Sequence, residues 1–460
     1  MFRSVKKVHF VGIGGIGMSG IAELLLNLGF EISGSDLQNS EITDRLASLG
    51  AEIFIGHAAD NLDDSDVLVY SSAVRESNPE IQAARLKGIP IIRRAEMLGE
   101  LIAVKETSIA VGGTHGKTST SSMIGTLLTV AGQDPTLVVG GLVHTLKSNT
   151  QLGSGEIIVV EADEYDRSFL MLRPTLAVVT NIEMEHTDCY ENLEDYQNAF
   201  LQFCNSVPFY GAVVVCLDSP GVQEIISGIK RPVITYGFSN QADVQAEEMS
   251  FRETRTSFTV RSRGQVLGTI TLQVPGIHNV SNALAAVAVG LEMGLSEDLI
   301  RKGLEAYTGV RRRFDIKGIR QGIMVVDDYA HHPTEVKATL KAARTGWDRR
   351  IVAVFQPHLF SRTRDFYREF ARHFLASDVL IITDVYPARE DPIPGITGEL
   401  VADAARELGH RQVYYEPDLD RIIPLLNEVT QSGDMVITLG AGTIWRTSQA
   451  YYDQLEDDTH

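Results

Sequence analysis

The sequence predicts an α/β protein of three domains, and three observations support this fold class. The chain has 460 residues, which is more than a single hydrophobic core usually holds. Short apolar segments typical of buried parallel strands alternate with segments of helical apolar spacing. Two glycine-rich turns each lie between a predicted strand and a predicted helix. These features favour successive β-α units around open sheets.

The first predicted domain spans residues 1–105. A helix is expected at 17–28, and strands are expected at 8–13, 31–36, 67–70 and 90–92. The turn GIGGIG at 12–17 fits the pattern G-x-G-x-x-G, and Asp36 lies where a ribose-binding acid occurs in dinucleotide-binding domains. Loop amides and a helix dipole suit any pyrophosphate, including that of a UDP-sugar. A purely structural turn is the third interpretation.

The second predicted domain spans residues 106–311. Its expected helix is at 118–131, and its expected strands are at 108–111, 156–160, 176–179 and 212–215. Alternating polarity at 243–274, with a turn at Arg263 and Gly264, predicts a small antiparallel appendage. Helical spacing returns at 281–306. The third domain, 312–460, repeats β-α units, with strands expected at 351–355, 379–382 and 435–439.

The segment GGTHGKT at 112–118 predicts an ATP site. It follows a predicted strand and begins a predicted helix, so loop amides are expected to face the β-phosphate. Lys117 supplies a cation and Thr118 a magnesium ligand. The strict pattern G-x-x-x-x-G-K-[ST] requires glycine at position 111, where this chain has Val111. An ordinary strand-to-helix turn is the alternative.

Two acidic segments follow predicted strands of the same sheet. Residues 161–166 (EADEYD) and 180–186 (TNIEMEH) are expected at the carboxyl edge, beside the phosphate loop. Magnesium prefers oxygen ligands, so ligation by Thr118 or Glu161 is more firmly predicted than ligation by His186.

The composition limits the class of binding partner and the cellular compartment that are expected for this chain. A net charge of −19 argues against nucleic acid as the main partner. The three cysteines have no metal-ligand spacing and fit a reduced cytoplasm. No apolar run reaches 18 residues, and the N-terminal apolar run lacks the features of a signal peptide, so neither a membrane span nor secretion is expected.

Seven segments together resemble the Mur ligase family, and in particular its branch that adds L-alanine to UDP-N-acetylmuramate. Their order matches the family's pattern, and they lie at 12–20, 113–118, 161–164, 180–186, 276–282, 327–335 and 356–363. No lysine occurs between Lys147 and Lys230, which agrees with that branch, because members adding later amino acids use a modified lysine there. The resemblance implies a Rossmann-like N-terminal domain, a central P-loop ATPase-type domain with the appendage, and a Rossmann-like C-terminal domain.

The resemblance also implies roles for individual residues. UDP-sugar is expected at Gly14, Gly15, Ile16, Gly17 and Asp36. ATP is expected at Gly113, Thr114, His115, Gly116, Lys117, Thr118, Ser119, His278, Asn279, Arg313 and Asp328. Mg²⁺ is expected at Thr118, Glu161 and His186, and the sugar lactate and L-alanine at Tyr329, His331, His358 and Arg362. Lys117, His186 and Arg362 are the expected catalytic residues.

Three other functions remain in competition at this point. A nicotinamide-dependent oxidoreductase is supported by the turn at 12–17 and by Asp36. A recycling ligase that attaches a ready-made peptide to the same sugar nucleotide shares the motifs. A non-catalytic ATP-binding regulator would not need Lys117, Thr118, Glu161 and His186 together.

Overall fold

A computed structural model describes residues 5–71, 73–143, 148–186, 189–388 and 390–455. The chain divides into two compact units. The first comprises Met1–Glu248, Thr259–Ile270 and Ser281–Tyr307, and the second comprises Met249–Phe258, Thr271–Val280 and Thr308–His460. Within the described residues, no helix combines the length and apolar character needed to cross a membrane.

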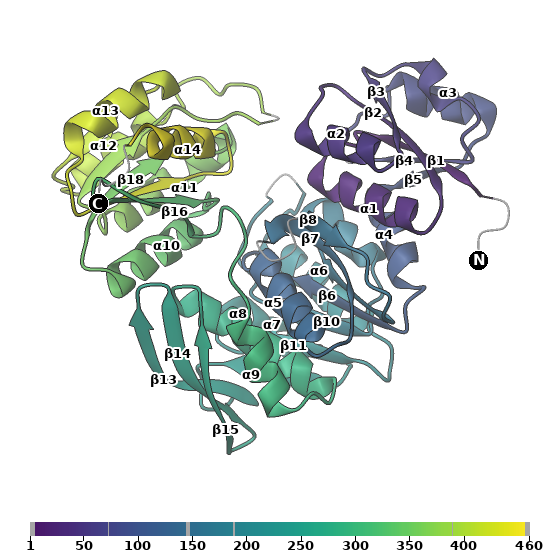
Figure 1. Cartoon of the computed structure of the whole chain (residues 1–460), viewed down its shortest axis with the longest axis horizontal. Helices are drawn as coiled ribbons and strands as arrows, with labels where there is room; N and C mark the ends of the chain where they lie inside the picture. The colour runs from purple at the N-terminus through teal and green to yellow at the C-terminus, as the bar shows by residue number, and fades with distance from the viewer. Residues whose placement is uncertain (1–4, 72, 144–147, 187–188, 389, 456–460) are drawn as a thin grey trace. The chain divides into compact units, whose positions relative to one another are not determined.

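The N-terminal part of the first unit is a five-stranded parallel sheet with strand order β3-β2-β1-β4-β5 (Figure 1). Its strands are β1 (Lys7–Val11), β2 (Glu31–Asp36), β3 (Glu52–Ile55), β4 (Val67–Tyr70) and β5 (Ile91–Arg93). Its helices are α1 (Ile16–Asn27), α2 (Glu41–Ser48), α3 (Pro79–Lys87) and α4 (Arg94–Ile102), with the 3₁₀ turn η1 (Ala59–Leu62). The predicted alternation of strands and helices is therefore present here.

A ten-stranded sheet follows, with strand order β15-β14-β13-β12-β11-β10-β6-β9-β7-β8. Its first strands are β6 (Thr107–Gly112), β7 (Thr136–Val143), β8 (Ser148–Gln151), β9 (Ile157–Glu161) and β10 (Leu176–Val179). The others are β11 (Ala212–Cys216), β12 (Val233–Gly237), β13 (Val244–Arg252), β14 (Arg255–Ser262) and β15 (Gln265–Leu272). Strand β6 lies between β10 and β9 and runs parallel to both, so the carboxyl ends of all three meet at one edge.

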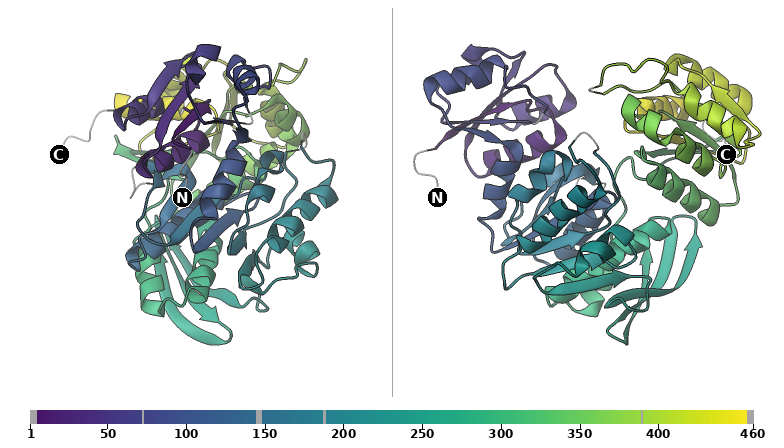
Figure 2. Two further views of the ribbon diagram at one scale, coloured as in Figure 1. Left: turned by 90° about the vertical axis from the view of Figure 1, so that its right-hand side faces the viewer. Right: turned by 180° about the vertical axis from the view of Figure 1, so that it is seen from behind.

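Helices cover both faces of the parallel part of this sheet. Helix α5 (Lys117–Val130) lies on one face and α6 (Leu193–Asn205) on the other (Figure 2). Helix α7 (Pro220–Ile226) packs beside α6, and the 3₁₀ segment η2 (Tyr165–Met171) follows β9. Two-residue turns join β13 to β14 and β14 to β15, a connection that only antiparallel neighbours allow, so the predicted appendage is present.

The helical segment predicted at 281–306 is divided into two helices. Helix α8 (Ile277–Glu292) begins earlier than predicted, and α9 (Glu297–Glu305) follows. Gly294 separates them with a φ of 73°, a left-handed conformation in which glycine is favoured. Ser296 then caps α9 by accepting a hydrogen bond from the Leu299 amide.

The second unit contains a six-stranded sheet with strand order β16-β17-β21-β18-β19-β20, parallel except for β16. Its strands are β16 (Asp315–Arg320), β17 (Ile323–Asp328), β18 (Arg350–Phe355), β19 (Val379–Ile382), β20 (Val413–Tyr415) and β21 (Asp434–Leu439). Helices α10 (Pro333–Gly346), α11 (Phe360–Phe374) and α12 (Glu399–Glu407) share one hydrophobic core. On a second core lie α13 (Ile422–Val429), α14 (Ile444–Gln454) and the turn η3 (Leu419–Arg421).

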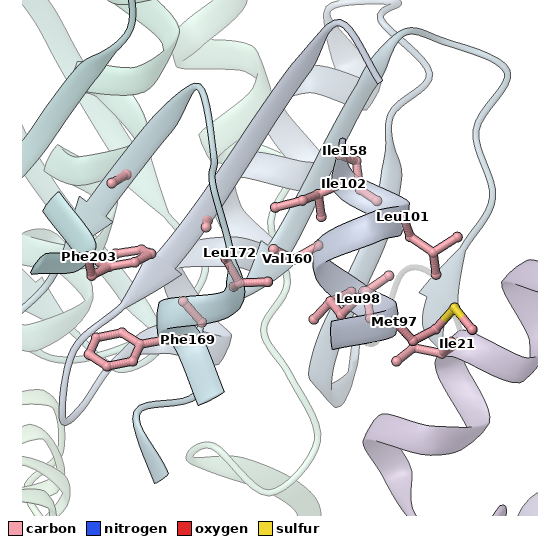
Figure 3. Close-up of a cluster of buried hydrophobic side chains, with 14 of the residues drawn as sticks. Ile21, Met97, Leu98, Leu101, Ile102, Ile158, Val160, Phe169, Leu172 and Phe203 are labelled. Carbon is pink, nitrogen blue, oxygen red and sulfur yellow. The ribbon is translucent and has the colours of Figure 1, made fainter. Parts of the chain in front are cut away.

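Helix α4 joins the two sheets of the first unit through a shared hydrophobic cluster (Figure 3). Met97, Leu98 and Leu101 of α4 lie among Ile21 of α1 and Ile158 of β9. All five side chains are buried. Helix α4 therefore fixes the N-terminal sheet against the sheet that carries the phosphate loop.

We expect Leu98→Ala to destabilise the first unit by about 2–5 kcal/mol, because it leaves a cavity in this cluster. Leu98 is 5% exposed, whereas Leu86 on α3 is 89% exposed and provides the matched control. Leu86→Ala should change stability by no more than about 0.5 kcal/mol. Urea unfolding of both variants, followed by circular dichroism, measures the difference. Equal unfolding curves for the two variants would contradict the role of the cluster.

Candidate active site

The loop from Gly113 to Gly116 joins β6 to α5 and requires glycine at both ends. Gly113 and Gly116 have φ values of 133° and 83°, which side-chain-bearing residues rarely adopt. A Cβ atom on Gly116 would lie 2.7 Å from Oδ1 of Asn282, and one on Gly113 would collide with Thr180. The strand, loop and helix predicted around the GKT segment are therefore present, and glycine at position 111 is not needed for the turn.

The Lys117 ammonium lies inside this loop, at the first residue of α5. Its Nζ atom donates to the carbonyl oxygens of Gly113 at 2.6 Å and Thr114 at 3.2 Å. It also contacts both carboxylate oxygens of Glu164, at 3.1 and 2.8 Å. Glu164 is in addition 3.2 Å from Nε2 of His186. Glu164 thus connects two predicted catalytic residues, Lys117 and His186.

Electrostatics favour the charged forms of these side chains. Burial alone would disfavour the charged form of each, but the proximity of Glu164 outweighs burial and raises the pKa of Lys117. Burial likewise opposes ionisation of Glu164, yet Lys117 and His186 lower the pKa of that carboxyl. The pKa of His186 is raised despite its burial, through its hydrogen bond to Glu164 and the charge of Glu185.

The segment after β10 is hydrogen-bonded to the phosphate loop. The amide of His115 donates to Oδ1 of Asn181 at 2.9 Å, and the hydroxyl of Thr180 donates to the carbonyl of His115. The hydroxyl of Thr114 donates to the carbonyl of Glu183 and accepts from its amide, both at 2.9 Å. The phosphate loop and the segment at 180–186, which the sequence placed at one sheet edge, are therefore hydrogen-bonded together.

The predicted magnesium ligands lie around the same edge. Thr118 is the second residue of α5, and Glu161 ends β9, where a Cβ on Gly140 of β7 would lie 2.6 Å from its Oε2. His186 follows β10 with a φ of 55°. Ligand atoms of Glu164, Glu185 and His186 lie within 4.8 Å of one another. Two carboxylates in this group suit a hard divalent cation.

The N-terminal glycine turn lies between β1 and α1, as predicted. The amide of Gly14 donates to Oδ2 of Asp36 at 2.8 Å, which places the predicted ribose acid directly against the loop. Gly15 caps α1, whose first residue is Ile16. A Cβ on Gly17 would lie 2.7 Å from Nη1 of Arg94.

Four predicted nucleotide residues, His278, Asn279, Arg313 and Asp328, belong to the second unit. Burial and the charge of Arg313 lower the pKa of His278 to about 4, so its imidazole is neutral at pH 7. The side-chain amide of Asn279 donates to the carbonyl of Pro275 at 2.8 Å. Asp328 is buried and accepts from the amides of Phe314 and Ala330, both at 2.8 Å. Burial raises the pKa of Asp328 to about 6.

The four residues predicted to bind lactate and alanine form a contiguous group in the second unit. The ring of His331 lies 5.2 Å from that of Tyr329 and 5.7 Å from that of His358. Nδ1 of His358 lies 3.2 Å from Nη1 of Arg362, a buried residue in the first turns of α11. The ring of Tyr386 stacks on His358 at 5.8 Å. The guanidinium of Arg362, the two imidazoles and the phenols of Tyr329 and Tyr386 therefore lie close together.

Sequence reasoning missed Glu164, Arg94 and Tyr386 as site residues. Glu164 lies in the acidic segment that was recognised, but no residue spacing distinguishes it from Glu161 or Asp163. Arg94 follows the predicted strand at 90–92, and its Nη2 lies 3.5 Å from Asp163. Tyr386 follows β19, at the same sheet edge as His358, so its position after a strand was the available signal.

Three family descriptions match successive parts of the chain. Residues 7–106 match "Mur ligase family, catalytic domain", residues 111–290 match "Mur ligase middle domain", and residues 312–442 match "Mur ligase, glutamate ligase domain". Together they cover most of the chain.

Relatives of known name are similar over the full length. UDP-N-acetylmuramate–L-alanine ligase of Salinibacter ruber is 53% identical over 99% of this chain and 96% of its own. The enzyme of the same name from Geotalea uraniireducens is 50% identical over all of both chains. The solved structure of UDP-N-acetylmuramate-alanine ligase from Thermotoga maritima has a TM-score of 0.84 at 30% identity, covering 97% of this chain and 98% of its own. The chain therefore belongs to the Mur ligase family and has the three-domain α/β fold of that family.

Proposed function

We propose that this protein is the ATP-dependent ligase that joins L-alanine to the lactyl carboxylate of UDP-N-acetylmuramate, in peptidoglycan precursor synthesis in the cytoplasm. Relatives with this name are 50–53% identical over almost the whole chain. The observation that carries the proposal is the phosphate loop, in which Lys117 begins α5 beside a buried carboxylate and His186. The N-terminal glycine turn then serves the second phosphate-bearing substrate, the UDP-sugar.

Each predicted domain has one task in this proposal. Residues 1–105 bind the UDP-sugar, with Asp36 and Gly14 to Gly17 at its pyrophosphate or ribose. Residues 106–311 bind ATP, and 312–460 close over the nucleotide and the amino acid. His278 and Asn279 hold adenine, Asp328 lies near the ribose, and Arg313 reaches phosphate. Neutral His278 suits a hydrogen bond to a neutral base, because its pKa is lowered to about 4.

The proposed reaction activates a carboxylate before the amide bond is formed. The lactyl carboxylate attacks the γ-phosphate of ATP, and ADP leaves. The amine of L-alanine then attacks the acyl phosphate, and inorganic phosphate leaves with the oxygen that the carboxylate contributed. All the reacting groups of the first step are negatively charged, so the main tasks of the protein are charge neutralisation and alignment. Lys117 performs the first of these tasks at the transferred phosphoryl group.

A magnesium ion bound by Thr118, Glu161 and His186 would neutralise phosphate charge. The carboxylates of Glu164 and Glu185 near His186 provide the negative environment that a divalent cation requires. In the second unit, Arg362 is suited to a carboxylate, because its guanidinium presents several donors in one plane. His331 or His358 accepts the proton that the alanine amine loses, and Tyr329 lines the same group.

The test of the overall reaction is phosphate release with each component omitted in turn. We expect release only when ATP, UDP-N-acetylmuramate, L-alanine and a divalent cation are all present. A tripeptide used more efficiently than alanine would instead identify the recycling ligase. A solved structure of a murein peptide ligase from Psychrobacter arcticus resembles this chain with a TM-score of 0.71 at 25% identity. Absorbance changes of a nicotinamide cofactor would identify an oxidoreductase.

Lys117→Ala should lower kcat by at least about 10²-fold, because it removes a preorganised cation from the developing phosphoryl charge. The same phosphate-release assay measures this effect. Lys302→Ala is the matched control, since Lys302 lies on α9 and pairs with exposed Asp298. Circular dichroism checks that both variants are folded. Turnover of Lys117→Ala at the wild-type rate would remove Lys117 from the mechanism.

Arg362→Ala should lower kcat/KM for the acceptor substrates by about 10- to 100-fold, as expected for a lost hydrogen bond to a charged group. Arg364 on the same helix provides the control, because it is exposed and pairs with its neighbour Asp365. Initial rates with varied L-alanine and UDP-N-acetylmuramate compare the two variants. Equal effects of both substitutions would exclude a specific role for Arg362.

A further inference from the structure

Glu164 stands out in the first unit as a buried carboxylate in direct contact with Lys117. Its side chain is 1% exposed, and it contacts Lys117 at 2.8 Å and His186 at 3.2 Å. We infer that Glu164 is a positioning residue that holds the Lys117 ammonium in the nucleotide-free protein and gives it up to the phosphates of ATP. This inference rests on the proposed function, in which Lys117 binds phosphate.

The hydrogen-bonding capacity of Lys117 supports a competition between Glu164 and phosphate. An ammonium group has three N–H donors. In this structure, four oxygen atoms surround it, two from backbone carbonyls and two from Glu164. All of its donors are therefore engaged, and a phosphate oxygen can bind Lys117 only if one of these acceptors withdraws.

The carboxylate is the acceptor that can withdraw. The two carbonyls belong to Gly113 and Thr114, and the conformation of this loop is fixed by the hydrogen bonds of Thr114 to Glu183 and of Thr180 to the carbonyl of His115. Glu164, by contrast, reaches Lys117 through a side chain with rotatable bonds. Its backbone stays in place, because the hydroxyl of Tyr190 donates to the Glu164 carbonyl at 2.6 Å.

Glu164 keeps a partner after this exchange. Nε2 of His186 already lies 3.2 Å from Oε1 of Glu164. The separation of Lys117 from Glu164 therefore does not leave the buried carboxylate without a hydrogen-bond partner. Phosphate in turn provides Lys117 with a new anionic partner.

Neutralising Glu164 should affect ATP affinity in opposite directions in two cases. In one, Glu164 competes with phosphate for Lys117; in the other, its ion pair with Lys117 only supports the loop. Without the carboxylate, Lys117 loses the anion in direct contact with it, and the charges of Asp163 and Glu185 remain nearby. An anionic ligand then no longer has to displace that contact. Glu164→Gln should therefore bind ATP about tenfold more tightly than wild type, since hydrogen bonds to charged groups are of this size. A purely structural role predicts equal or weaker binding, because the loop would be disturbed.

The experiment measures ATP binding by isothermal titration calorimetry in EDTA, without UDP-sugar or alanine. Removing divalent cations ensures that a change in metal affinity does not contribute. Asp166→Asn is the matched control, because Asp166 lies two residues away, is exposed and faces Arg93. Asparagine tolerates the φ of 54° at this position. The control should bind ATP as wild type does.

Two further variants make the test specific for Lys117. In a Lys117→Ala background, Glu164→Gln should no longer tighten ATP binding, because the ammonium for which Glu164 and phosphate compete is absent. Glu164→Asp keeps the charge on a shorter side chain and should give an intermediate affinity, so it carries the test if Glu164→Gln does not fold. The increase in melting temperature on adding ATP should also be larger for Glu164→Gln than for wild type.

The outcomes separate this inference from the proposed function. Wild-type binding of ATP with unchanged or weaker binding by folded Glu164→Gln, or by Glu164→Asp in its place, overturns only the role of Glu164. If Glu164→Gln still tightens ATP binding in the Lys117→Ala background, the role of Glu164 is also overturned, because the effect does not depend on Lys117. If the wild-type protein binds no ATP under any condition, including added magnesium, both the proposed function and the inference fail.

Discussion

The site in the first unit depends on one constraint, the placement of a lysine ammonium where water reaches it poorly. A buried cation is stable only beside an anion and with its donors satisfied. Glu164 supplies the anion, and the carbonyls of Gly113 and Thr114 supply further acceptors. The loop has to turn sharply to present these carbonyls, which is why Gly113 and Gly116 have positive φ values. The conformation of the loop and the position of Glu164 are thus consequences of one buried charge.

The order of strands explains how segments distant in the sequence reach this lysine. Strand β6 leads into the phosphate loop, and its two neighbours in the sheet are β9 and β10. Because the three strands are parallel, their following segments all emerge at the same edge. Glu164 of residues 161–166 therefore contacts Lys117, and Asn181 of residues 180–186 accepts a hydrogen bond from the loop at His115. A different neighbour for β6 would have removed either Glu164 or Asn181 from the site.

Much of this arrangement could be predicted from the sequence, because buried parallel strands are continuous apolar runs and the loops after them carry the chemistry. The strands at 67–70, 176–179 and 379–382 agree with the structure at both ends. Strand β16 escaped prediction, since a register shift between Ile316 and Gly318 interrupts its alternation. Individual side chains in irregular loops were harder to predict than the loops themselves.

Glu164 illustrates this difficulty. Three carboxylates lie within residues 161–164, and neither helical nor strand periodicity applies to a segment that turns through positive φ values at Asp166 and Arg167. Arg94 and Tyr386 are similar cases, because their roles depend on contacts with Asp163 and His358, far away in the sequence. Local pattern identifies which loop carries chemistry, whereas tertiary packing determines which of its side chains faces the reacting groups.

Ion pairs between cationic side chains and carboxylates also explain how an acidic chain can bind its proposed anionic substrates. The net charge is −19, yet the cations assigned to or adjoining phosphate sites each face a carboxylate. Lys117 faces Glu164 at 2.8 Å, Arg313 faces Glu335 at 3.4 Å, and Arg94 faces Asp163 at 3.5 Å. These carboxylates hold the cations in defined positions before a substrate arrives. The free energy of binding an anion is then the difference between two ion pairs, so local geometry determines affinity more than net charge does.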